Sequence, residues 1–62
     1  MDTEFAVKFR HANGTIHYTF VWAANAEALF SQVESTGAVV LLWAARRASD
    51  PFDARELLSS YE

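Results

Sequence analysis

The chain has 62 residues and a mass of 7.0 kDa, which allows one small domain over residues 1–62 and excludes scaffolds that need several cores. Hydrophobic residues make up 52% of the chain and exclude a disordered tail. Eight acidic against five basic residues give a net charge of −3, which disfavours a protein that binds nucleic acid through clustered cations.

The chain contains no cysteine, so neither a disulfide nor a thiolate metal ligand can stabilise the fold. Small secreted domains commonly depend on disulfides, and a reducing, cytoplasmic setting is therefore expected. The first residues include Asp2 and Glu4 and lack the apolar segment of a signal peptide. The longest apolar run, residues 38–45, is too short to cross a bilayer.

Residues 4–22 predict a β-hairpin, because two segments with alternating apolar side chains flank the dipeptide Asn13-Gly14. A two-residue loop of type I′, with positive φ at both turn residues, places Phe9 opposite Tyr18 and Val7 opposite Phe20. In this register one apolar face is shared by Phe5, Val7, Phe9, His11, Ile16, Tyr18, Phe20 and Trp22.

A helix over residues 26–36 follows, because apolar residues recur at helical spacing after the N-cap candidate Asn25. Glu27 suits its first turn and Gly37 its end. We expect this helix to cover one core made of Phe5, Val7, Phe9, Tyr18, Phe20, Leu29, Phe30 and Val33.

The continuous apolar run that ends just before Arg46 predicts a third strand over residues 38–46. A second, short helix is predicted over residues 51–61, with Ser49-Asp50 as the cap and Pro51 at the first helical position. The fold class is therefore α+β, in the order β-β-α-β-α, with two to three layers. The favoured sheet is wholly antiparallel with the strand order 2-1-3, and the alternative places the third strand parallel to the second.

No residue pattern indicates catalysis, a cofactor or a metal, so we expect a protein that is not an enzyme. The predicted register puts His11 and His17 on opposite sheet faces, where they cannot share an ion. The only glycines, Gly14 and Gly37, are assigned to a turn and a helix end rather than to a phosphate loop. The carboxylates are interpreted as helix caps and solvated surface groups.

The third strand is apolar on both faces, which is unusual for a small monomer. We therefore predict a protein-interaction module that forms a homodimer or binds a protein partner, unless the second helix covers this surface within one chain. The size and layout, though no motif, are typical of small proteins of phage and plasmid genomes. The alternative is a small nucleic-acid-associated regulatory protein that uses Lys8, Arg10, Arg46 and Arg47. The residues expected at the protein interface are Val40, Leu42, Trp43, Leu57, Leu58 and Tyr61.

Overall fold

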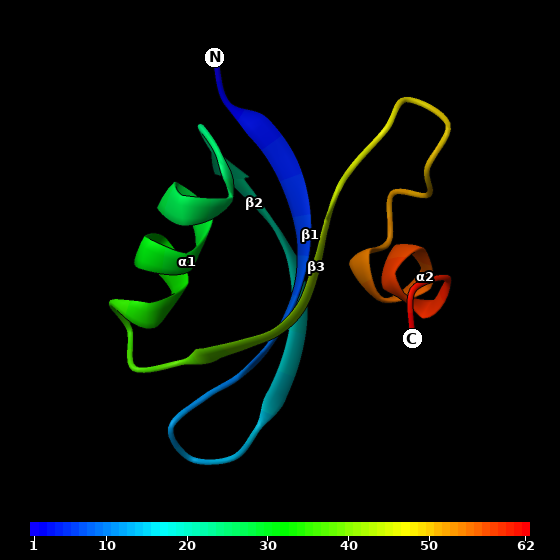
Figure 1. The fold of residues 1–62 in the computed structure, drawn as a ribbon. Coiled ribbons are helices and arrows are strands. Elements are labelled where there is room, and N and C mark those ends of the chain that lie inside the picture. The colour runs from blue at the N-terminus through cyan, green and yellow to red at the C-terminus, as the bar shows by residue number, and fades with distance from the viewer.

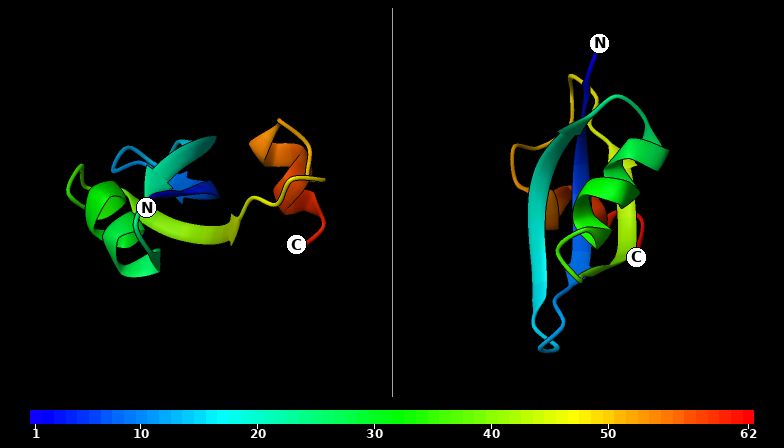
Figure 2. Two further views of the ribbon diagram at one scale, coloured as in Figure 1. Left: turned by 90° about the horizontal axis from the view of Figure 1, so that it is seen from above. Right: turned by 90° about the vertical axis from the view of Figure 1, so that its left-hand side faces the viewer.

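The computed structural model describes residues 1–62 and shows an α+β domain of three layers (Figures 1 and 2). Helix α1 lies on one face of a three-stranded sheet and helix α2 lies on the other. The sheet order is β2-β1-β3 with both pairs antiparallel, as predicted. The elements are β1 (Thr3–Arg10), β2 (Ile16–Ala23), α1 (Ala26–Glu34), β3 (Val39–Ala45) and α2 (Ala54–Ser59).

The loop that joins β1 to β2 has three residues between its flanking pair, not two. Gly14 donates its backbone N–H to the carbonyl of His11 at 2.9 Å, and His11 donates to the carbonyl of Thr15 at 2.8 Å. Gly14 has a φ of 91°, whereas Asn13 keeps a negative φ and accepts the Thr15 N–H on its side chain at 3.0 Å. This is a type I turn followed by a glycine bulge, so the predicted type I′ turn is wrong.

The additional loop residue shifts the hairpin register by one position. Phe9 lies opposite His17 rather than Tyr18. Because successive side chains of a strand point to opposite faces, a shift of one residue turns all of β2 over. Tyr18 and Phe20 therefore face α2, whereas Val21 faces α1.

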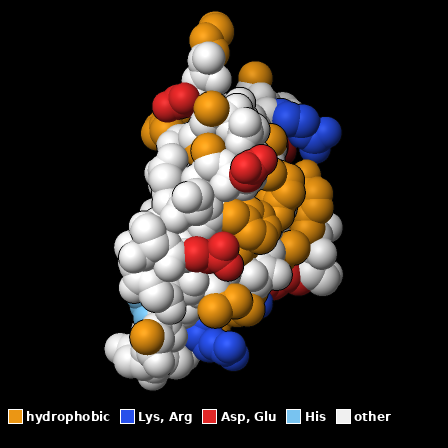
Figure 3. Space-filling view, turned by 60° about the vertical axis from the view of Figure 1, so that its left-hand side comes forward, with side chains coloured by type: hydrophobic (Ala, Val, Ile, Leu, Met, Phe, Trp, Pro, Cys, Tyr) orange, Lys and Arg blue, Asp and Glu red, His pale blue; other side chains and the backbone are white.

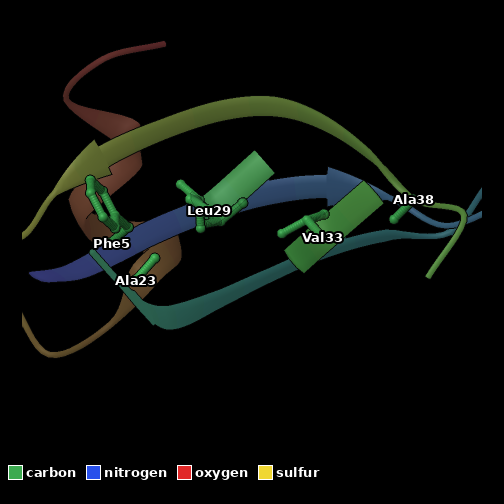
Figure 4. Close-up of a cluster of buried hydrophobic side chains, with 6 residues drawn as sticks. Phe5, Ala23, Leu29, Val33 and Ala38 are labelled. Carbon is green, nitrogen blue, oxygen red and sulfur yellow. The ribbon is translucent and has the colours of Figure 1, made fainter. Parts of the chain in front are cut away.

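The core beneath α1 is smaller than predicted (Figure 4). Leu29 and Val33 are buried against the sheet as expected, but Tyr18 and Phe20 lie on the other face and Phe30 is only half-buried. The six buried residues of this cluster are Phe5, Val7, Ala23, Leu29, Val33 and Ala38.

A second core lies between the sheet and α2. Its centre is Ala6 of β1, whose small side chain lets Leu57 and Leu58 pack closely on the middle of the sheet. Tyr18 and Phe20 pack around this cluster. Helix α2 thus covers the outer face within one chain, which was the alternative to its use in assembly.

The helix boundaries follow from the caps. Asn25 accepts the Ala28 N–H at 2.8 Å and begins α1 as predicted, but regular helix ends at Glu34 rather than at residue 36. Helix α2 begins only after Asp53, whose carboxylate accepts the Arg55 N–H at 3.0 Å. The predicted cap is wrong because Asp50 accepts a backbone N–H within the preceding loop. Pro51 therefore precedes the helix, and the predicted limits 38–46 and 51–61 shorten to those of β3 and α2.

Replacing Gly14 tests the turn. No heavy atom lies within 4 Å of the position of an added Cβ, so the cost comes from the backbone, which must hold a β-branched residue at positive φ. We expect Gly14→Val to lower the free energy of unfolding, measured by urea denaturation, by about 1 kcal/mol or more. Ala12→Val, at an exposed loop position with negative φ, should cost clearly less, and equal costs would contradict the turn.

Truncation on each face tests whether there are two cores. Leu29 and Leu58 are fully buried on opposite sides of the sheet. We expect Leu29→Ala and Leu58→Ala each to destabilise the protein by about 2–5 kcal/mol, measured by thermal or urea unfolding. The exposed Ile16→Ala is the control and should change stability little. A Leu58→Ala protein as stable as this control would show that α2 does not pack as described.

Candidate functional site

Strand β3 is an edge strand that pairs only with β1. Arg46, just past its end, donates its backbone N–H to the carbonyl of Glu4 at 2.8 Å. Because hydrogen-bonding direction alternates along an antiparallel strand, Ala44 also faces β1, and the backbone groups of Trp43 and Ala45 point away from the sheet. These groups are free to pair with another strand.

The edge is apolar along its whole length. Residues 39–45 contain no charged residue and no proline, which are the usual means by which proteins protect an edge strand. One bulge, where Leu41 is the additional residue opposite Lys8 and Phe9, is the only irregularity in the pairing. Leu41 is 44% exposed and Trp43 is 38% exposed.

An apolar flank lies beside this edge on the side of α1 (Figure 3). The ring of Trp43 meets Phe30 of α1 at 6.2 Å between centroids and Phe5 at 5.6 Å, both edge to face. Leu41, at the bulge two residues before Trp43, is the second exposed apolar side chain along this edge. We call Phe30, Leu41, Trp43 and the free backbone edge of β3 the β3 edge surface.

Opposite charges lie near the two ends of β3. Helix α1 ends at Glu34, shortly before β3 starts, and carries no basic residue in its last turn, so this end is negative. Arg47 follows the other end of β3, and its side chain is 74% exposed although it lies 3.6 Å from Asp50. Arg10 of β1 also lies opposite Val39 at the first end, so Glu34 and the end of α1 supply the negative charge there beside one basic residue.

The six residues predicted as an interface do not share one surface. Leu57 and Leu58 are only 2% and 0% exposed because they fill the core under α2. The prediction that these two residues of the C-terminal helix lie at an interface is therefore wrong for the single chain. Leu42 lies on the same sheet face as these two residues. The other three are Val40 and Trp43, on the face of α1, and the exposed Tyr61 beyond α2.

The basic residues of the alternative prediction do not form a free cationic track. Arg10 is exposed and makes no ion pair, while the other three each meet a carboxylate of the same chain. The pairs are Lys8 with Glu62 at 2.8 Å, Arg46 with Glu4 at 3.7 Å and Arg47 with Asp50 at 3.6 Å. This arrangement gives no support to phosphate binding.

The ion pair between Lys8 and Glu62 links the segment after α2 to β1. Glu62 accepts from Lys8 at 2.8 Å and from the hydroxyl of Tyr18 at 3.4 Å. The hydrogen bond with Glu62 raises the pKa of the Lys8 ammonium above its ordinary value. The same hydrogen bond lowers the pKa of the Glu62 carboxyl.

This pair predicts a pH dependence at both ends of the scale. Since the pKa of Glu62 is lower in the folded chain, the ionised carboxylate stabilises the fold above about pH 4.3, the ordinary pKa of Glu. This contribution to folding stability is lost as pH falls through the folded pKa. Since the folded pKa of Lys8 is raised, its stabilisation is present below about pH 10.4 and is lost as pH rises through the folded pKa. Carbon-detected NMR titration should show the pKa of Glu62 rising in Lys8→Met and staying low in Arg10→Met. An unchanged Glu62 midpoint in Lys8→Met would refute the pairing.

A shallow pocket of about 210 Å³ opens between α1 and β2. Its lining has no ionisable side chain and therefore supplies no group for acid–base chemistry. Nowhere in the chain do three or more His, Asp or Glu residues come close enough to enclose a metal ion. The lining residues are Phe9, Thr19, Val21, Gln32, Val33 and Thr36.

Comparison of the chain with protein-family models, with curated proteins and with solved structures finds no match. None of the helices combines the length and the apolar character needed to cross a membrane. Function must therefore be inferred from geometry. The fold leaves the outer edges of β2 and β3 unpaired, and of these two strands only β3 consists entirely of apolar residues.

Proposed function

We propose that this chain is a small, non-catalytic protein-interaction module that binds a second copy of itself through the β3 edge surface. The observation that carries the proposal is the open, uncharged edge of β3, with exposed Leu41 and Trp43 beside it. Addition of a strand to such an edge satisfies the free backbone groups and covers the apolar flank in one step. The lack of cysteine agrees with action in the cytoplasm.

The strand itself favours a second copy as the occupant. Two β3 strands that pair antiparallel about a twofold axis through Leu42 overlap over Val39–Ala45, and the bulge at Leu41 of each strand interrupts the regular hydrogen-bond pattern. In this register Leu41 lies opposite Trp43 of the partner subunit, so each apolar side chain meets another. The result is a continuous six-stranded antiparallel sheet.

The charges at the ends of β3 agree with the same register. Arg47 lies opposite position 37 of the second chain, close to where α1 of that chain ends. The helix dipole and Glu34 make that end negative, so the exposed Arg47 meets an opposite charge twice in the symmetric dimer. A parallel arrangement would bring the two Arg47 side chains together instead.

A pairing of seven residues is a small interface, and binding also costs translational and rotational freedom. We therefore expect a reversible dimer with a dissociation constant on the order of micromolar, about 8 kcal/mol of association free energy. The free chain keeps its fold because both cores are complete within it.

Light scattering or sedimentation equilibrium over a range of concentrations tests the dimer. The wild-type mass should rise from 7.0 kDa to twice that value as concentration rises. Leu41→Lys should hold the chain at the single-chain mass, because a buried, unpaired ammonium opposes pairing. Ile16→Lys is the matched control: Ile16 is 43% exposed on the other edge strand, and the variant should dimerise like the wild type.

A charge exchange tests the register. Arg47→Glu should weaken the dimer, and adding Glu34→Arg should restore it, because both charges are then reversed and the attraction between them is kept.

A mass of 7.0 kDa up to about 1 mM would overturn the dimer, since that limit corresponds to only about 4 kcal/mol. Equal loss in Ile16→Lys and Leu41→Lys would place the contact elsewhere. Salt-sensitive binding of nucleic acid by the single chain would favour the alternative based on the four basic residues.

A further inference from the structure

The two histidines of the hairpin lie on the same face of the sheet, which corrects the expectation that they lie on opposite faces. His17 is directly opposite Phe9, and His11 follows Phe9 at an interval of two residues. Both imidazoles therefore stand on the side of α1, as diagonal neighbours across the two strands. The one-residue change in register that turned β2 over also created this pair.

The imidazole rings are close and share a common neighbour. Their centroids are 5.6 Å apart, with the planes inclined at 78°. The ring of Phe9 lies 4.9 Å from that of His11 and 5.3 Å from that of His17. Both imidazoles therefore lie against one side chain, which keeps them beside each other on this face of the sheet.

This spacing suits a metal ion held between the two rings. With a metal–nitrogen bond of about 2.0 Å, two imidazoles on one tetrahedral ion have ring centres about 5 Å apart. The observed 5.6 Å is close to this value, but the rings meet edge to face, so at least one ring must rotate before a nitrogen of each can reach the same ion. Neutral imidazole is a common ligand of Zn²⁺, Ni²⁺ and Cu²⁺.

We propose that His11 and His17 form a two-imidazole site for a divalent first-row transition-metal ion at the tip of the hairpin. No third His, Asp or Glu completes the set, so water fills the remaining positions and the ion stays accessible. Cu²⁺ binds more tightly than Zn²⁺, as the general order of affinities for nitrogen ligands requires. The ion joins β1 to β2 and stabilises the hairpin by mass action.

The site is independent of the proposed dimer, because it uses ring geometry at the hairpin and not the edge of β3. The monomeric Leu41→Lys protein should therefore bind the ion as the wild type does, which separates failure of one proposal from failure of the other.

Titration of ZnCl₂ and CuCl₂ into the full chain, followed by calorimetry and by NMR of the imidazole protons, tests the site. We expect one ion per chain and simultaneous perturbation of both histidines. His17→Thr and His11→Asn should each weaken binding at least about tenfold, equivalent to about 1.4 kcal/mol. Ile16→Thr is the matched control, because it changes the residue beside His17 on the opposite face and should bind normally.

The same variants should differ in thermal unfolding. Zn²⁺ should raise the midpoint of the wild type and of Ile16→Thr, and should leave that of His17→Thr unchanged. Dispersed amide spectra of the metal-free variants will show that each is folded. The proposal is overturned if either histidine variant binds like the wild type, if only one histidine is perturbed, or if the wild type binds no ion at about 1 mM, a limit near 4 kcal/mol.

Discussion

Strand β1 is buried on both faces, and the other elements are arranged around it. Two adjacent residues of this strand, Ala6 and Val7, are both fully inaccessible to solvent although their side chains point in opposite directions. Val7 supports the core under α1, and Ala6 supports the core under α2. A large side chain at position 6 would hold α2 away from the sheet, so the methyl group of Ala6 is what allows Leu57 and Leu58 to close that face.

The two hydrophobic cores contain only six and five buried residues, so few side chains remain to cover the edges of the sheet. Helix α2 has six residues, a length of about 9 Å, and packs mainly on β1, on the face of the sheet opposite α1 (Figure 1). The apolar residues of β3 consequently have α1 on one side and no neighbour along their free edge. A single chain of this size therefore exposes Leu41 and Trp43 even though both of its cores are complete. The proposed dimer would cover this exposed surface.

The loop of the hairpin controls features far from it. One additional residue in the loop places Tyr18 beside Lys8 and Glu62, and so allows the segment after α2 to be fastened to the sheet. The same residue brings His17 next to His11. An Asn-Gly dipeptide is compatible with both loop lengths, because Asn13 can either adopt positive φ itself or use its side chain to bind the Thr15 N–H. The choice is made by packing on the two faces.

The sequence by itself determined the number, type and order of the elements, because Asn25, Gly37 and the alternation in β1 are local signals that act within a few residues. It also indicated the strand order, and it identified β3 as apolar on both faces. The register of β2 could not be determined in the same way, since both faces of β2 carry apolar residues and the more apolar face is not the one under α1. Only the tertiary structure decided it, by adding α2 as a second covering layer that buries Leu57 and Leu58 and accepts Tyr18 and Phe20. The two candidate sites follow the same division. The sequence predicts strand β3, but the contact of Trp43 with Phe30 depends on the face that each residue occupies in the fold. The same is true of the pairing of His11 with His17.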